Sequence, residues 1–238
     1  MNRERGHVEY GQHCIEFVVV RRKRTTLELA VEPDATVVIA APLSASMEAI
    51  AEKVRKRASW VRRQQQFFLQ FVPRTPPRRY VSGETHLYLG RQYRLKVIAG
   101  GLPEVRLLRG VMLVQSQFPK RADVTRDLVN AWYRVRSQKW FADRLEVNLL
   151  RFPNPERVRP IGLIIRHLRQ RWGSMSPGHR MLLNQRLIQA PVYSIDYVIT
   201  HELCHVAEPS HGPVFFKLLN RILPDWQQRK QRLECLLS

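Results

Sequence analysis

The stretch YSIDYVITHELCHVAEPSH, residues 193–211, decides the fold of the second half of this chain. Its apolar residues keep the spacing of one helical face: Ile195, Ile199, Leu203 and Val206. His201 and His205 are one helical turn apart, so both imidazoles project to one point, away from that apolar face. The pattern predicts a helix that packs on the core and presents two nitrogen ligands to a metal.

A third ligand and a base complete the predicted metal site. Pro209 cannot continue the helix, so the chain turns there and His211 can return to the metal. Three neutral imidazoles leave one position for water, which is typical of a catalytic zinc site, whereas a structural site is usually closed by four protein ligands. Glu202 lies where it can take a proton from that water. The alternative is a His-rich helix end whose imidazoles only make hydrogen bonds.

The other histidines and the cysteine inside the motif are expected to be structural or to face solvent. A small buried residue is favoured over a thiolate ligand at Cys204. His86 is isolated in a predicted strand and His179 lies in a predicted turn. The same expectation covers the remaining three: His7, His13 and His167.

Patterns along the rest of the chain predict an α+β fold. Strands are predicted at 15–41, in short hairpins turning at Gly90, Gly100 and Gly110, at 162–174 and at 180–188. Helices are predicted at 45–70, with Ser44 as N-cap, and at 121–150. PRTPPRRY (73–80) reads as a linker. No internal repeat is evident in the sequence.

Composition limits the class of protein. The chain has 238 residues, 44% of them hydrophobic, so it can bury a core. No run is long enough for a membrane span, no signal peptide opens the chain, and three scattered cysteines form no disulfide framework. We therefore expect a cytoplasmic protein. Its 40 Lys and Arg against 20 Asp and Glu give a net charge of +20, which suits an anionic partner such as nucleic acid or nucleotide.

The segment RWGSMSPGHRMLLNQRLIQAPVYSIDYVITHELCHVAEPSHGPVFF (171–216) resembles the signature of the YgjP-like metallopeptidase family, relatives of the SprT-like and WLM zincins. VRRKRTTLELAV, SWVRRQ and GETHLYLGRQYRLKV resemble its N-terminal part, so the resemblance spans about residues 18–234. It implies a zincin-like core, in which the active-site helix packs on a small β-sheet. We expect an N-terminal β-rich subdomain with one long helix over 1–119 and the catalytic subdomain over 120–238.

The resemblance also implies roles for individual residues. His201, His205 and His211 match the family's ligands for one Zn²⁺ per chain, and Glu202 matches its catalytic glutamate. The RWGS strand would bind an extended substrate at its edge: Arg171, Trp172, Gly173 and Ser174. Two positions depart from the family pattern, because Met175 replaces the usual Cys and Phe216 a common Trp.

The implied function is a zinc metallopeptidase of the HExxH type, which cleaves peptide or protein substrates with Glu202 as general base. Two alternatives remain. One is a metal-dependent UTP pyrophosphohydrolase on the same scaffold, in which Arg169, Arg171 or Arg186 would clamp phosphates. Against it, the chain has no P-loop. The other is a nucleic-acid-associated protein with a structural metal. The sequence leaves the oligomeric state open.

Overall fold

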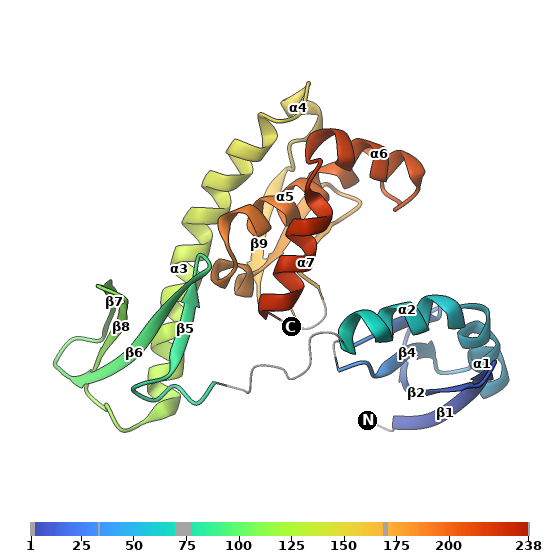
Figure 1. The fold of residues 1–238 in the computed structure, drawn as a ribbon, viewed down its shortest axis with the longest axis horizontal. Helices are drawn as coiled ribbons and strands as arrows, with labels where there is room; N and C mark the ends of the chain where they lie inside the picture. The colour runs from blue at the N-terminus through green and yellow to red at the C-terminus, as the bar shows by residue number, and fades with distance from the viewer. Residues whose placement is uncertain (1–2, 33, 70–77, 169–170, 238) are drawn as a thin grey trace. The chain divides into compact units, whose positions relative to one another are not determined.

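The computed structural model describes residues 3–32, 34–69, 78–168 and 171–237, which fall into two compact units divided between Thr75 and Pro76 (Figure 1). Each unit buries its own apolar core. The division therefore does not lie at residue 119/120, where the sequence suggested it. Residues 73–77 of the predicted linker lie outside the described residues.

The first unit is a four-stranded sheet covered by two helices. Its elements are β1 (Arg3–Tyr10), β2 (His13–Arg22), β3 (Glu28–Val31), β4 (Val37–Pro42), α1 (Met47–Lys56) and α2 (Ala58–Leu69). The strand order is β1-β2-β4-β3, with β2 and β4 parallel and the outer pairs antiparallel. Phe17, Ile39 and Val54 are among the residues that fill its core. Strand β1 was not predicted from the sequence.

The long helix predicted over 45–70 is interrupted. Helix α1 begins after Ser46, whose hydroxyl accepts a 3.2 Å hydrogen bond from the Ala49 backbone N–H. Ser46 is therefore the N-cap, and not Ser44. Arg57 separates α1 from α2, and its N–H bonds back to the Val54 carbonyl. The break redirects the chain, and Val61 on α2 is still buried in the same core.

The second unit contains two small sheets and the remaining helices. Its strands are β5 (Thr85–Tyr88), β6 (Arg91–Ala99), β7 (Glu104–Leu108), β8 (Val111–Ser116), β9 (Gly162–Arg166), β10 (Gly173–Met175) and β11 (Arg180–Asn184). Its helices are α3 (Ala122–Leu149), α4 (Pro155–Val158), the 3₁₀-helix η1 (Gln185–Gln189), α5 (Val192–Ala207), α6 (Pro213–Ile222) and α7 (Trp226–Leu237). The fold is α+β, and no helix in the described part of the chain is long and apolar enough to cross a membrane.

The helix with the HELCH motif packs between α3 and the three-stranded sheet. That sheet has the order β10-β11-β9, with β10 antiparallel and β9 parallel to β11. Helix α5 contacts α3, α6, α7 and the edge strand β10. Residues 185–188, expected to extend strand β11, instead form η1. The Asn184 side chain ends the strand because it accepts a 3.1 Å hydrogen bond from the Arg186 N–H.

The β5–β8 sheet belongs to the same core as α5, which explains where the chain divides. The turn between β5 and β6 donates the Leu89 and Gly90 N–H groups to the carbonyls of Ile188 and Gln189. Gly90 has φ +79°, and a Cβ there would come within 2.8 Å of Pro191. Only glycine fits this turn against the start of α5. A boundary at 119/120 would cut through this contact.

The two units each contain one four-stranded sheet and a following helix with the same topology. Order β5-β6-β8-β7 repeats β1-β2-β4-β3, with the same parallel central pair. Buried positions recur 75 residues apart, in the pairs Val37/Met112, Ile39/Val114, Ala41/Ser116, Ile50/Thr125, Val54/Val129 and Ala58/Tyr133. We call β1–β4 with α1 the first module, and β5–β8 with the first half of α3 the second module. The sequence hides this repeat, because between 37–58 and 112–133 only Val54 and Val129 are identical.

Candidate metal centre

Three imidazoles meet at the C-terminal end of α5. His201 and His205 come from consecutive turns of the helix, and His211 follows the turn at Pro209. The Nε2 atom of His211 lies 2.9 Å from that of His201 and 3.1 Å from that of His205. In a tetrahedral zinc site with Zn–N bonds of roughly 2.0–2.1 Å, ligand nitrogens are about 3.3 Å apart. Among the described residues, no other group of His, Cys, Asp and Glu side chains could hold a metal ion.

The surroundings keep these imidazoles in the form that binds a metal. Burial lowers the pKa of His201 to about 3, helped by the neighbouring His211 and His205. Burial also lowers the pKa of His211. The His205 Nδ1 lies 3.1 Å from the Glu208 carbonyl, so it carries the proton and leaves the Nε2 lone pair for a metal. Beneath the three rings lies the fully buried Phe215, with centroid distances of 4.6–4.9 Å.

Glu202 lies beside the imidazoles, and the backbone of strand β10 approaches its carboxylate closely. A Cβ at Gly173 would lie 2.9 Å from the Glu202 Oε1, so glycine lets strand β10 approach the carboxylate. The buried Oε2 has no hydrogen-bond partner among the described residues. Burial raises the pKa of Glu202 to about 8, against the opposing effects of the Arg171 guanidinium and the Met175 N–H. A nearby cation would lower this pKa, because positive charge favours the carboxylate.

A buried polar network fixes α5 on α3. Asp196 accepts two 2.7 Å hydrogen bonds from the Arg144 guanidinium and one of 2.9 Å from the Asn148 amide. The Thr200 hydroxyl donates to the Asn148 side-chain oxygen Oδ1 at 3.1 Å. Asp196 and Thr200 lie on the turns just before the HELCH residues. The network therefore sets how far α5 lies along α3, and with it the position of the imidazoles.

A cavity of about 610 Å³ opens over the three imidazoles. Its walls come from α5, from strand β10 and from the β10–β11 turn. The lining side chains include one carboxylate, Glu202, and one side chain of the Lys or Arg type, Arg171. The β10 edge lies along it. Trp172 and Ser176 bond to β11, so the alternate residues Gly173 and Met175 turn their backbone groups away from β11, and the Met175 N–H bonds to Glu202.

The four residues of the RWGS segment divide into two groups. Arg171, Gly173 and Ser174 line the cavity. Trp172 faces the other way and packs against the core, where its ring lies 5.7 Å from the Arg186 guanidinium and its indole bonds to Glu234. Arg186 itself donates to the Leu237 carbonyl at 2.9 Å. Of the three arginines expected to clamp phosphates, Arg171 lines the cavity, Arg186 does not, and Arg169 lies outside the described residues.

Neither His179 nor Cys204 was expected to be a metal ligand. His179, expected to be structural or to face solvent, is exposed and lines the cavity from the β10–β11 turn, where its φ is +53°. The turn residues Pro177 and Gly178 were the available signal, because a hairpin that begins at RWGS must return beside the motif. Cys204 is fully buried, and burial raises its pKa to about 12, so it remains a thiol and faces no metal.

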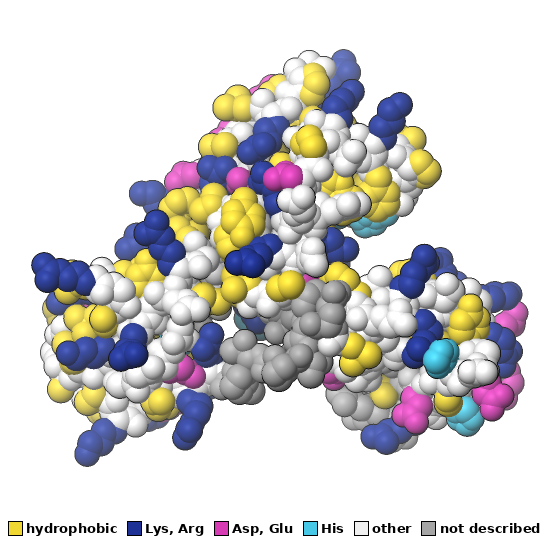
Figure 2. Space-filling model, viewed as in Figure 1, with side chains coloured by type: hydrophobic (Ala, Val, Ile, Leu, Met, Phe, Trp, Pro, Cys, Tyr) yellow, Lys and Arg dark blue, Asp and Glu magenta, His cyan; other side chains and the backbone are white. Residues whose placement is uncertain are grey.

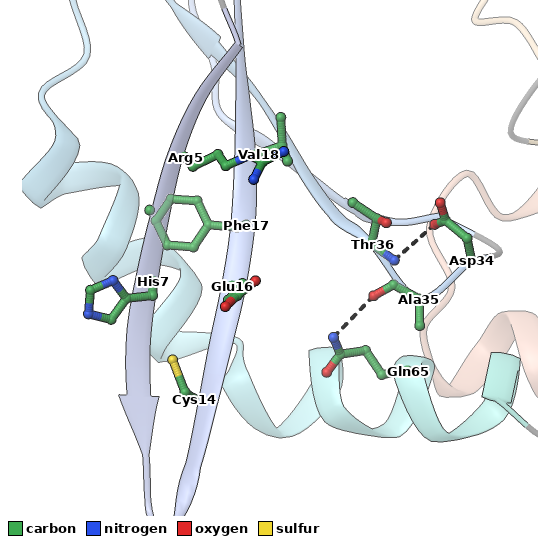
Figure 3. Close-up of a pocket in the computed structure, with 11 residues that line it drawn as sticks. Arg5, His7, Cys14, Glu16, Phe17, Val18, Asp34, Ala35, Thr36 and Gln65 are labelled. Carbon is green, nitrogen blue, oxygen red and sulfur yellow. Dashed lines mark hydrogen bonds between the residues drawn. The ribbon is translucent and has the colours of Figure 1, made fainter.

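A second cavity of about 690 Å³ lies in the first unit, as Figure 3 shows. It brings His7, Cys14 and Glu16 to one surface of β1 and β2, residue types that could suggest a second metal site. Their side chains lie apart in the close-up and do not converge. No metal-binding group was found there among the described residues. The three imidazoles of the second unit thus differ from a chance collection of polar side chains, and their donor set fits zinc.

The positive charge is dispersed. Figure 2 shows Lys and Arg side chains spread over the visible face of both units, interleaved with acidic and apolar ones. Several arginines are paired, among them Arg21 with Glu4, Arg159 with Glu146 and Arg229 with Asp225. A nucleic-acid partner therefore remains a prediction from the net charge alone.

Comparison with known families gives one match. Residues 25–235 match the family described as "YgjP-like, metallopeptidase domain". The match includes the first unit only from Thr25 onward, so β1 and β2 lie outside it, and it includes all residues of the metal centre described above. No curated protein and no solved structure matches the chain.

Proposed function

The chain belongs to the YgjP-like metallopeptidase family, and from this premise we propose that it is a zinc-dependent peptidase. Membership of the family indicates a metal-dependent hydrolase. The proposal goes further in naming the metal, the base and the bond that is cut. The cytoplasm is the proposed place of action, and the free state of Cys14, Cys204 and Cys235 agrees with it.

One observation carries the proposal. Three imidazole nitrogens converge on a point beside a buried carboxylate oxygen, Glu202 Oε2, that has no partner among the described residues. A structural metal site has no use for such an oxygen, because an unpaired buried acceptor destabilises the fold. A general base needs it free to accept a proton from water. The site therefore has the composition of a hydrolase active site rather than that of a structural metal site.

Each residue of the site would have a separate role in peptide hydrolysis. His201, His205 and His211 would hold the Zn²⁺, which when bound polarises water and a carbonyl group. Glu202 would accept the proton of the attacking water at Oε2 and pass it to the leaving amine. Gly173 keeps the β10 backbone close to this carboxylate. The free edge of β10 would align an extended peptide by main-chain hydrogen bonds.

The experiment pairs metal content with peptide cleavage. Wild-type protein should bind one equivalent of zinc and cleave peptides of an unbiased mixture. His205→Ala should lose both, whereas Glu202→Gln should keep the zinc and lose at least about 10²-fold in rate. His7→Ala is the matched control, because this exposed histidine lies in the first unit.

Three results would overturn the proposal. Zinc-loaded wild type that cleaves no peptide, but releases pyrophosphate from UTP in a Glu202-dependent way, would replace the peptidase by a phosphohydrolase. Folded protein that takes up no zinc would contradict both a zinc peptidase and a zinc phosphohydrolase. Zinc that stays bound in His205→Ala would mean that the metal binds elsewhere.

A further inference from the structure

Arg171 is the one side chain of the Lys or Arg type that lines the cavity over the imidazoles. Its guanidinium makes no hydrogen bond and no ion pair with a described residue. Most of the arginines around the site are engaged, as Arg144 is with Asp196 and Arg186 with the Leu237 carbonyl. An arginine with a free guanidinium in a concave site is suited to bind a carboxylate, because its planar fork donates two parallel hydrogen bonds.

The backbone of Arg171 is held in place. The Asn184 amide, 2% exposed, donates to the carbonyls of Leu168 at 2.9 Å and Arg171 at 3.0 Å. The Asn184 backbone N–H also bonds to the Trp172 carbonyl at 2.8 Å. A buried side chain and its own backbone thus hold the carbonyls of Arg171 and Trp172, just before β10. The guanidinium extends from a preorganised base, so less conformational entropy is lost when it binds a ligand.

The charges of the cavity favour an anionic substrate. Glu202 is the one carboxylate among the lining residues, and the zinc of the proposed function would add positive charge next to it. With the zinc bound, the cavity would carry a net positive charge, and an acidic group of the substrate would be attracted into it.

Chain length limits the distance from the cut. Arg171 lies two residues before Gly173, so their Cα atoms are at most about 7 Å apart along the chain. Gly173 touches Glu202, which marks the reacting centre. A peptide laid along β10 has the same rise per residue. Its residue opposite Arg171 would therefore be about two positions from the scissile bond.

We propose that Arg171 is a specificity-determining residue that binds an acidic side chain of the peptide within about two residues of the bond that is cut. The inference rests on the proposed peptidase function. The substrates are then acidic peptide segments. Arg171 itself takes no part in the chemistry on the scissile bond.

The test uses a neutral peptide that the wild type cleaves, with a single glutamate moved through the four positions on either side of the cut. One position within two residues should raise kcat/KM about tenfold or more, mainly through KM. Arg171→Gln should abolish this preference, and Arg171→Lys should keep part of it. Arg171→Glu should reverse it, so that a lysine at the same position becomes favoured. Arg180→Gln is the matched control, because this exposed arginine lies on the same hairpin but not in the cavity.

Binding is measured separately from turnover. In the Glu202→Gln background the peptide stays uncut, and calorimetry should show the same glutamate preference, lost when Arg171→Gln is added. Zinc content of each variant verifies that the site is intact. Cleavage without an acidic preference, or a preference that survives Arg171→Glu, would overturn this inference and leave the peptidase standing. If no peptide is cut while UTP is hydrolysed and Arg171→Gln weakens UTP binding, both proposals fall.

Discussion

The two modules have the same frame, a four-stranded sheet with a following helix, but their helices differ in length and in what they pack against. In the first, α1 ends at Lys56, the chain turns at Arg57, and α2 covers the same core. In the second, α3 runs for 28 residues without a break, and its second half extends beyond the β5–β8 sheet. Its second half forms the surface on which α5 packs, through Phe141, Arg144 and Asn148. Figure 1 shows α3 running from the β5–β8 sheet to α4.

The difference shows that the sheet-and-helix frame carries no chemistry of its own. Equivalent buried positions, such as Val54 and Val129, serve packing in both modules. The proposed active site depends on what the second module adds, namely a longer helix with an arginine and an asparagine on its extension. A comparison of matched changes in the two units can therefore separate the stability of the frame from the function of the site.

The largest expected difference concerns the metal. Saturating zinc should stabilise the second unit by about 4 kcal/mol at a thousandfold excess over Kd, because only the folded site binds it. The first unit should not respond. Hydrogen exchange measures the stability of both units in one experiment. It is followed by mass spectrometry on peptides from each unit, with and without a chelator.

His205→Ala should abolish the zinc effect on the second unit, and His7→Ala should leave it unchanged. Equal protection of both units by zinc would contradict the comparison. It would mean that the two units unfold together or that the metal binds outside the three imidazoles.

The next effect compares two bidentate ion pairs. In the second unit Asp196, with 6% side-chain exposure, bonds to Arg144. In the first unit Glu4, with 38% exposure, bonds to Arg21. Asp196→Asn should cost about 3 kcal/mol because it leaves a largely buried charge without its counterion, and it should also weaken zinc binding. Glu4→Gln should cost clearly less, because water screens this more exposed pair.

Chemical denaturation and zinc titration of both variants measure this difference. Equal losses would mean that burial does not distinguish the two pairs. An Asp196→Asn variant that loses stability but binds zinc as tightly as the wild type would refute the idea that this network positions the imidazoles.

The sequence predicted local features well. The helix 121–150 agrees with α3, and the helix predicted within 193–211 agrees with α5, because both carry a sustained apolar period. It also identified the three imidazoles that the structure brings together, since spacing along one helix and a forced turn at Pro209 suffice to predict their meeting. The expected α+β class is the one observed.

Features that depend on contacts distant in sequence were missed. The divide at Thr75/Pro76 follows from the packing of Gly90 on Pro191, which no local pattern reveals. The repeat of the two modules is invisible because apolar residues of different shape replace each other at equivalent positions. The Arg144–Asp196 pair joins residues 52 apart in the chain, and His179 enters the cavity only through the return of a hairpin.

A matched pair of core substitutions sharpens the comparison of the frames. Val54 and Val129 are both 0% exposed and 75 residues apart. Val54→Ala and Val129→Ala should each cost about 2 kcal/mol, because two buried methyl groups are lost and the cavity closes only partly. The loss should appear in the first unit for Val54→Ala and in the second for Val129→Ala.

Hydrogen exchange on peptides from the two units locates each loss. Zinc affinity should fall only in Val129→Ala, and only slightly, since this residue lies in the half of α3 that covers the sheet. A clear fall of zinc affinity in Val54→Ala would show that the first unit supports the site, contrary to the comparison.

The smallest effect is a pH dependence at one equivalent position. Strand pairing matches Val8 of the first module with His86 of the second, and both are buried, at 2% and 3% exposure. Burial lowers the pKa of His86 below its ordinary value of 6.5, although Glu84, 3.1 Å away, acts to raise it. Neutral His86 is therefore favoured in the fold.

This contribution of His86 is complete above pH 6.5 and is lost as the pH falls from there towards the lowered pKa, because the unfolded chain then takes up a proton that the folded chain does not. The loss cannot exceed about 1.4 kcal/mol per pH unit for one proton. His86→Val should remove it, so the difference in unfolding free energy between wild type and variant should change between pH 6.5 and 5 in metal-free protein. Val8→His should introduce the same dependence into the first unit, and more steeply, because Gly6 there stands in place of Glu84 and offers no carboxylate. If the difference in unfolding free energy between the wild type and His86→Val stays constant over this range, His86 is not the group that titrates. The two modules then respond to acid alike at this position.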